Sequence, residues 1–177
     1  MHAENGLSGG GARLERLASA SLRSEAMLAL ERRDWSEAVP ALRELLRRFP
    51  ADAGLWVQLS YAESLRGQYR SARQAALSAS RSRPATPDIA TDIVARLRTF
   101  NAVQELRDYL RLIGPPSSMP IPLLLAAAAQ CSYLNDQPAA LLLLDEARRA
   151  DPDFPTTLIA RAQVLTYLGR LEEAEQE

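Results

Sequence analysis

The sequence of 177 residues contains no lysine, one histidine and one cysteine, and all 21 of its basic residues are arginine. Without lysine, the chain can form neither a Schiff base nor the lysine contact of an ordinary phosphate-binding loop. One histidine and one cysteine cannot build a His/Cys metal cage or a disulfide framework. We therefore expect no catalytic residue, no metal and no cofactor in this chain, and a binding activity instead.

β-Branched residues are also scarce, with five valines, five isoleucines and no alternating apolar pattern. We therefore expect no β-sheet. The net charge of −1 argues against gross nucleic-acid binding, although residues 66–111 carry a net charge of +5 and residues 136–177 a net charge of −5. The uncharged stretch 112–135 contains four prolines and does not resemble a membrane span.

The first twelve residues lack the apolar run of a signal peptide and contain the glycine run Gly9-Gly10-Gly11. We expect residues 1–12 to form a flexible tail that includes the single histidine, His2, and the protein to be cytoplasmic. Because no strand precedes the glycine run and no lysine follows it, we interpret it as linker rather than as a phosphate cradle.

A repeat of 34 residues organises the rest of the chain. Pro50, Pro84 and Pro152 lie on one such lattice, with Ser118 at the remaining node. A second set on the same lattice consists mostly of small residues, namely Ala38, Ala72, Leu106, Ala140 and Ala174. Small side chains let two helices approach closely, and proline ends a helix. The lattice therefore predicts a stack of helix pairs.

This pattern resembles the tetratricopeptide repeat family. The second repeat is closest to it, because residues of the family's types occur at coordinated positions: Trp56, Leu59, Gly67, Tyr69, Ala72, Ala79 and Pro84. The resemblance covers residues 19–177. It implies an all-α fold, an α-solenoid of antiparallel helix pairs with about four and a half repeats. Within a solenoid domain of residues 13–177, the repeats are 19–52, 53–86, 87–120, 121–154 and the truncated 155–177.

Two repeats depart from the pattern. In the third, Ala90, Val94 and Leu106 replace the usual Trp, Gly and Ala. Its second helix must stop near Gly114-Pro115-Pro116, so we expect a shortened helix and a local irregularity. The fifth repeat reaches only Glu177, without the polar cap that usually ends a solenoid.

The resemblance also implies that the first helix of each repeat lines a concave groove. Carrying over the family's groove positions gives the following candidates for partner contact: Arg23, Met27, Val57, Gln58, Tyr61, Thr91, Asp92, Arg98, Leu125, Ala129, Tyr133, Gln163 and Tyr167. Less distinctive side chains at the same positions include Ser24, Leu30, Ser64, Ala95 and Ile159. Most of these residues are small or apolar, which suits an apolar or helical segment of a protein or peptide partner.

The groove and the charged residues also allow other interpretations. Family members that grip a terminal carboxylate resemble one another in a clamp of Lys, Arg and Asn, whereas the clamp positions here hold Ser24, Met27, Val57, Tyr61 and Asp92. The segment around Leu14 and Leu17 could instead fill the groove. Five arginines of the second repeat form either a basic ridge for an acidic partner or, as we favour, a solvated helix face: Arg66, Arg70, Arg73, Arg81 and Arg83.

The remaining chemically distinctive residues favour packing. Cys131 lies in the middle of a predicted helix, where a buried cysteine acts as a small apolar side chain. Trp35 and Trp56 occupy positions that face the core of the repeat. No acid–base or nucleophile arrangement accompanies any of them, so we expect a chain without enzymatic activity of its own.

Three functional hypotheses follow. The first is a protein–protein interaction scaffold that binds a peptide or helix in the concave groove. The second is the N-terminal docking or oligomerisation region of a longer bacterial enzyme, because Leu55–Tyr61 and Leu97–Asn101 resemble the repeat region of bacterial sulfotransferases that contain tetratricopeptide repeats. The third is self-association through the uncapped fifth repeat. The partner's identity and the oligomeric state do not follow from the sequence.

Overall fold

The computed structural model describes residues 7–84 and 86–177, and within them every regular element is a helix. In chain order the elements are α1 (Leu7–Glu31), α2 (Trp35–Arg48), α3 (Ala53–Leu65), α4 (Tyr69–Ser80), α5 (Pro87–Thr99), α6 (Val103–Ile113), the 3₁₀-helix η1 (Pro116–Ser118), α7 (Ile121–Tyr133), α8 (Gln137–Ala150), α9 (Pro155–Tyr167) and α10 (Leu171–Ala174). No strand occurs in these ranges, which agrees with the scarcity of β-branched residues.

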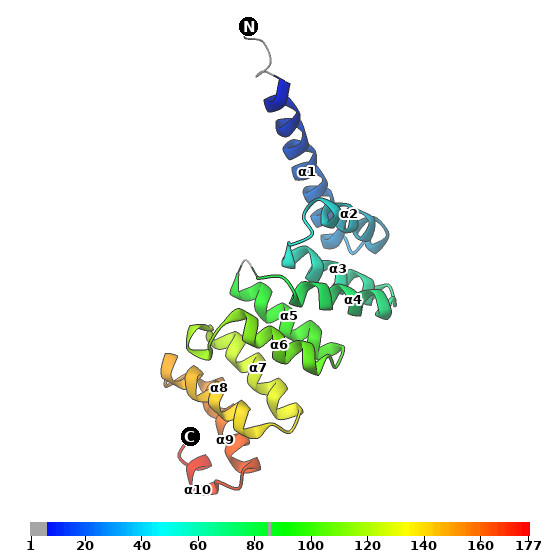
Figure 1. The fold of residues 1–177 in the computed structure, drawn as a ribbon. Helices are drawn as coiled ribbons and strands as arrows, with labels where there is room; N and C mark the ends of the chain where they lie inside the picture. The colour runs from blue at the N-terminus through cyan, green and yellow to red at the C-terminus, as the bar shows by residue number, and fades with distance from the viewer. Residues whose placement is uncertain (1–6, 85) are drawn as a thin grey trace.

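The helices form consecutive pairs that stack in chain order. Each odd-numbered helix packs against the even-numbered helix that follows it, and successive pairs meet through the contacts of α2 with α3, α4 with α5, α5 with α7, and α8 with α9. Helices α1 and α10 lie at opposite ends of the stack (Figure 1). The predicted fold class, an all-α solenoid of helix pairs, is confirmed.

One backbone conformation recurs in the turn inside every pair. The left-handed residues are spaced 34 apart, and they are Arg33, Gly67, Asn101, Asn135 and Gly169, with φ between 50° and 75°. The N–H group of the following residue donates to the carbonyl oxygen five residues earlier, as in Asp34 to Ala29 at 2.8 Å and Gln68 to Glu63 at 2.9 Å. Each turn thereby satisfies carbonyl groups that the first helix leaves open.

Small residues allow the helices of a pair to approach closely. Ala38, Ala72 and Ala140 are fully buried. Two clusters of apolar side chains follow from this packing. One joins α1 to α4, the other runs from α3 to α9, and Trp56 packs against both. The apolar core is therefore continuous along the stack rather than gathered at one centre.

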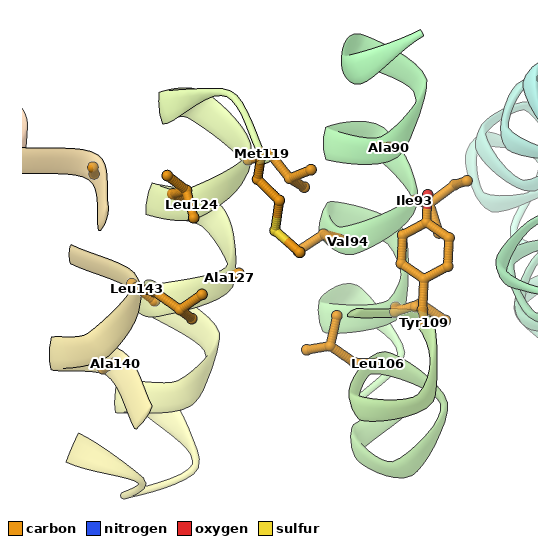
Figure 2. Packing of buried hydrophobic residues seen from close by; sticks show 14 of the residues in the cluster. Ala90, Ile93, Val94, Leu106, Tyr109, Met119, Leu124, Ala127, Ala140 and Leu143 are labelled. Atoms are coloured by element: carbon orange, nitrogen blue, oxygen red, sulfur yellow. The ribbon is translucent and has the colours of Figure 1, made fainter. Parts of the chain in front are cut away.

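The third pair has the predicted irregularity. Helix α6 ends after eleven residues at Gly114, whose φ of 117° is a left-handed value that terminates the helix. The chain then forms η1, and Met119 turns back into the core. Figure 2 shows the Met119 side chain between α7 and α5, next to Leu124 and Val94. A methionine from the connecting segment thus fills space beside the shortened helix.

The beginning of α1 corrects the expected tail. Residues 7–12, including the glycine run, lie in α1 and not in a flexible tail. Extending an existing helix adds a hydrogen bond for each residue fixed, and Leu7, Ala12 and Arg13 are good helix formers, so the three glycines do not end the helix. The first half of α1 projects beyond α2 (Figure 1). Residues 1–6, with His2, lie outside the described part of the chain.

Candidate functional site

A cavity of about 410 Å³ lies between the first three helix pairs. We call it the α3–α5 cavity, because most of its lining comes from these two helices. Its lining residues are Leu30, Trp35, Val57, Gln58, Tyr61, Asp92, Ala95, Arg96 and Thr99. Four of the candidate groove residues, Val57, Gln58, Tyr61 and Asp92, are thus brought together in one hollow.

The wall of the α3–α5 cavity is largely apolar. Leu30 and Val57 are half-buried, and both pack against the hydrophobic clusters. Trp35 also packs against the core, as the sequence indicates, but it lines the cavity as well, which corrects the interpretation of Trp35 as a packing residue alone. Tyr61 is 53% exposed at the cavity. Such a wall can take apolar side chains of a ligand.

Arg96 is the main polar feature of the cavity, and the carried-over groove positions do not include it. Its Nε donates to Ser60 Oγ and its Nη2 to the Ser60 carbonyl oxygen, both at 3.1 Å, and Nη2 also donates to Ser64 Oγ. The guanidinium lies over the ring of Tyr61 at 5.8 Å and over that of Phe100 at 5.0 Å. These contacts hold it in one place between α3 and α5.

The charge of Arg96 is not neutralised inside the described chain. No carboxylate of the described residues lies within ion-pair distance of it, and its hydrogen bonds go to neutral oxygen atoms through Nε and Nη2. Burial lowers the pKa of the Arg96 guanidinium, which reflects the cost of removing a charge from water. The N–H groups of Nη1 make none of the described hydrogen bonds, so they remain free to donate.

Asp92 lies one helical turn before Arg96 on α5 and also lines the cavity. The pKa of its carboxyl group is raised, first by partial burial and then by the nearby carboxylate of Asp88. An ion pair with Arg96 would shift this pKa downward. The direction of the shift therefore agrees with the geometry, in which Asp92 and Arg96 do not pair.

Gln58 contributes a second unsatisfied group. Its Oε1 is buried and accepts no hydrogen bond from the described residues, while its Nε2 lies 3.6 Å from Met27 Sδ. A buried amide oxygen without a donor is unfavourable. The α3–α5 cavity therefore combines an apolar wall with free donors at Arg96, while Gln58 Oε1 lies beneath the accessible surface.

Arg23 lies away from this cavity. Its guanidinium pairs with Asp52 at 3.0 Å, lies over the Phe49 ring at 5.8 Å, and lines a separate hollow with Arg48. The reason is local, because Asp52 caps the start of α3 and places a carboxylate beside α1. The structure thus separates Arg23 from the other groove candidates of the first three pairs.

The other candidates of the first three pairs make few outward contacts. Met27 is half-buried against the core of the first pair. The hydroxyl group of Thr91 donates to the Pro87 carbonyl oxygen at 3.0 Å. Arg98 is exposed on α5 and does not line the α3–α5 cavity.

In the last two pairs, the candidates occupy repeat positions equivalent to residues of the cavity wall. Tyr133 and Tyr167 follow Thr99 at intervals of 34 residues, and they are 72% and 78% exposed. Ala129 and Gln163 are equivalent to Tyr61 and are exposed, whereas Leu125, equivalent to Val57, is half-buried against the core. The same helix face thus continues beyond the cavity with two exposed aromatic rings.

The described N-terminal segment does not fill the cavity. Residues 7–31 form one helix, no residue before Leu30 lines the cavity, and Leu17 is 60% exposed. The alternative in which the segment around Leu14 and Leu17 occupies the groove is not what the structure shows.

The arginines of the second repeat are partly neutralised within the chain. Arg66 lies 3.7 Å from Glu63, and Arg73 lies 3.6 Å from Glu105. All five members of the proposed ridge are exposed. The structure is therefore compatible with the solvated helix face that we favoured, and Arg96 is the arginine with distinctive surroundings.

Cys131 packs against the main apolar cluster, and burial raises the pKa of its thiol. Within the described residues no group of three or more His, Cys, Asp or Glu side chains could hold a metal ion. None of the helices in the same part of the chain is long and apolar enough to cross a membrane.

The sequence did contain a signal for Arg96. Its position in the repeat is occupied elsewhere by Leu28, Ala62, Gln130 and Val164, three of which are buried. An arginine at such a position marks a charge that the fold must accommodate. The lattice could therefore have identified Arg96, although not the cavity that it faces.

Comparison with known proteins identifies the fold. The structure of MamA superposes with a TM-score of 0.68 at 10% identity, covering 89% of this chain and 86% of MamA. That of MamA 41-end from Desulfovibrio magneticus RS-1 gives 0.67 at 14% identity, covering 89% of each chain. YrrB, described as a TPR protein with an unusual peptide-binding site, gives 0.62 at 13% identity, covering 84% of this chain and 77% of YrrB.

These likenesses show a fold of the tetratricopeptide repeat type. No family model and no curated protein sequence matches this chain.

Proposed function

We propose that this chain is a protein-interaction scaffold that binds a peptide or helix of another protein along the face formed by α1, α3, α5, α7 and α9. The observation that carries the proposal is the α3–α5 cavity, because it is a largely apolar hollow on helices that the repeat pattern assigns to the groove. YrrB, which has a similar fold, is described as having a peptide-binding site. The cytoplasmic location expected from the sequence belongs to the same proposal.

The exposed tyrosines extend the proposed surface. Tyr61 lines the cavity, and Tyr133 and Tyr167 occupy positions equivalent to Thr99 in the last two pairs. Aromatic side chains give a large contact area for little loss of conformational entropy and often supply most of the binding energy of an interface. A partner segment that runs along the stack would contact Tyr61 first and the later tyrosines in turn.

The test begins with selection of peptides from a displayed random library on the whole chain. Dissociation constants of the selected peptides are then measured by fluorescence anisotropy with the wild type and with Tyr61→Ser and Tyr133→Ser. Loss of a central interface aromatic typically weakens binding by about tenfold or more. Tyr69→Ser is the matched control, because Tyr69 is 67% exposed but lies on α4, outside the proposed face.

The proposal fails if no peptide is enriched, or if Tyr69→Ser weakens binding as much as the two groove variants. Circular dichroism of all variants shows whether the helix content is retained. Because Tyr61 and Tyr133 are largely exposed, their loss should leave that content unchanged.

A second proposal concerns the context of the chain. The resemblance of Leu55–Tyr61 and Leu97–Asn101 to the repeat region of bacterial sulfotransferases supports a docking or oligomerisation region at the N-terminal side of a longer enzyme. Reading the gene beyond the codon for Glu177 tests this proposal. An in-frame stop directly after that codon removes it, whereas an open frame that encodes a catalytic domain supports it.

Self-association through the last pair is a third proposal. Tyr167 and Leu171 are both exposed there, at 78% and 58%. Exposed apolar residues on the last pair could pack against a second copy. Light scattering at two protein concentrations should show a higher mass at the higher concentration. A monomer at both concentrations contradicts the proposal.

A further inference from the structure

Arg96 is a partly buried positive charge that has no counter-ion among the described residues. It is half-buried, it is fixed between α3 and α5 by Ser60 and Ser64, and no carboxylate of the described residues pairs with it. Hydrogen bonds to neutral oxygen atoms and contacts with the rings of Tyr61 and Phe100 offset only part of the cost of burying a charge. An anion beside Nη1 would offset more of it.

The surroundings of Arg96 also indicate what else the ligand must carry. Leu30, Trp35 and Val57 form the apolar wall. A peptide segment supplies both required groups together, because it has apolar side chains and side chains with carboxylates. A free inorganic anion would leave the apolar wall without a contact.

We infer that the α3–α5 cavity binds an acidic side chain of the partner segment, an Asp or Glu whose carboxylate pairs with Arg96 while neighbouring apolar residues pack against Leu30, Trp35 and Val57. This inference rests on the proposed function and specifies the chemistry of the partner. The carboxylate belongs to a side chain in this assignment, and peptides amidated at the C-terminus separate it from a carboxylate at a chain end.

Charge complementarity at the cavity rests on Arg96 itself. Helix α5 carries two acidic and two basic side chains, Asp88, Asp92, Arg96 and Arg98, so the helix as a whole is neutral. Asp92 opposes the approach of an acidic segment locally, since its carboxylate lies one turn from Arg96 on the cavity wall. Arg96 attracts the ligand carboxylate and Asp92 repels it, so the two residues lead to opposite predictions. Removing the charge of Arg96 must weaken binding of the acidic side chain, and removing the charge of Asp92 must strengthen it.

The experiment uses the peptides selected on the whole chain. For a selected peptide that contains Asp or Glu, a partner peptide with Asn or Gln at that place is synthesised, and both are amidated at the C-terminus. Trp35 lines the cavity, so its fluorescence reports occupancy alongside anisotropy. We expect the acidic peptide to bind about tenfold more tightly than its amide counterpart.

The variants then locate the effect. Arg96→Gln should weaken binding of the acidic peptide about tenfold and that of the amide peptide less than about twofold, and Arg96→Lys should retain part of the preference. Asp92→Asn should strengthen binding of the acidic peptide about twofold. Arg107→Gln is the matched control, because it removes one exposed positive charge from α6 and should leave both affinities unchanged.

The possible results distinguish a failure of this inference from a failure of the proposed function. Enriched peptides without acidic residues, or equal affinity of the acidic and amide peptides, overturn this inference and leave the proposed function standing. The same holds if Arg107→Gln weakens the acidic peptide as much as Arg96→Gln does. If no peptide is enriched, both fail. If Arg96→Gln loses its helix content, the wild-type comparison of the two peptides and the effect of Asp92→Asn still decide the matter.

Discussion

The residue that turns each helix pair illustrates how a single position shapes this molecule. Five residues at intervals of 34 adopt a left-handed backbone, and four of them are glycine or asparagine, the residue types that tolerate it best. The exception is Arg33, with φ of 58°. Arginine has neither the freedom of glycine nor the short polar side chain with which asparagine hydrogen-bonds locally, so Arg33 is strained in this conformation and marks a turn whose sequence is not optimal.

Replacing this residue should stabilise the first pair. Arg33→Asn is expected to raise the free energy of unfolding by about 1 kcal/mol, since asparagine adopts the left-handed conformation more readily. Urea midpoints measure the change. Arg32→Asn, at the exposed neighbouring position, serves as the control and should change the free energy by less than about 0.5 kcal/mol. A loss of stability in Arg33→Asn would show that the arginine side chain contributes more than the strain costs.

The cap of α2 makes a prediction about pH. The Asp34 side chain accepts a hydrogen bond from Ser36 Oγ at 2.5 Å and others from the N–H groups of Ser36 and Glu37. The Ser36 hydroxyl, followed by the Glu37 N–H, lowers the pKa of Asp34 from 3.8. A lowered folded-state pKa means that this stabilisation is present above pH 3.8 and is lost as the pH falls through the folded-state value.

Asp34→Asn isolates this effect, because asparagine can still cap the helix but does not titrate in the acid range. The difference in thermal midpoint between wild type and variant should shrink as the pH falls from 6 to 2.5. A difference that stays constant over this range would show that the Asp34 carboxylate does not contribute through its charge.

Individual helices show what the sequence could predict and what it could not. The shortened α6 follows from Gly114 and the two prolines after it, which cannot continue a helix. The burial of Met119 does not follow from those residues, because it depends on the space that α5 and α7 leave beside the shortened helix. Local sequence rules thus predict where α6 ends. That Met119 fills the space beside the shortened helix can be seen only in the packed structure.

The contribution of Met119 can be measured. Met119→Ala should lower the free energy of unfolding by about 2–5 kcal/mol, the usual range for a buried methionine. Ser117→Ala changes an exposed residue of η1 and provides the control. If both variants have the same urea midpoint as the wild type, the segment after α6 does not anchor the fourth pair as Figure 2 indicates.

The candidate site was only partly predictable for a related reason. The groove positions implied by the resemblance to the tetratricopeptide repeat family included Val57, Gln58, Tyr61 and Asp92, which do share a face because they occupy successive first helices. The resemblance could not reveal that Asp52 draws Arg23 away, since that contact depends on how α1 and α3 are placed. The same is true of Glu63, which is 1% exposed and pairs with Arg43 of α2 at 2.5 Å. Partners from neighbouring helices decide where charged side chains lie.

At the scale of the whole molecule, the core is an extended succession of contacts. The cluster that joins α1 to α4 and the cluster that runs from α3 to α9 are connected through Trp56, so each pair depends mainly on its neighbours. Stability in such a stack is approximately a sum of contributions from the pairs and from the interfaces between them. A destabilising substitution in one helix pair should therefore affect mainly that pair and its neighbours.

Leu144 allows this to be tested with a control on the same helix. Leu144 is 1% exposed and Leu142 is 67% exposed, and both belong to α8. Leu144→Ala should lower the free energy of unfolding by about 2–5 kcal/mol, and Leu142→Ala by less than about 0.5 kcal/mol. Hydrogen exchange should then accelerate most in α7, α8 and α9 of the Leu144 variant and least in α1 and α2. An equal acceleration in all helices would show that the stack unfolds as one cooperative unit, in which case a partner bound at the α3–α5 cavity would stabilise the last pair as strongly as the first.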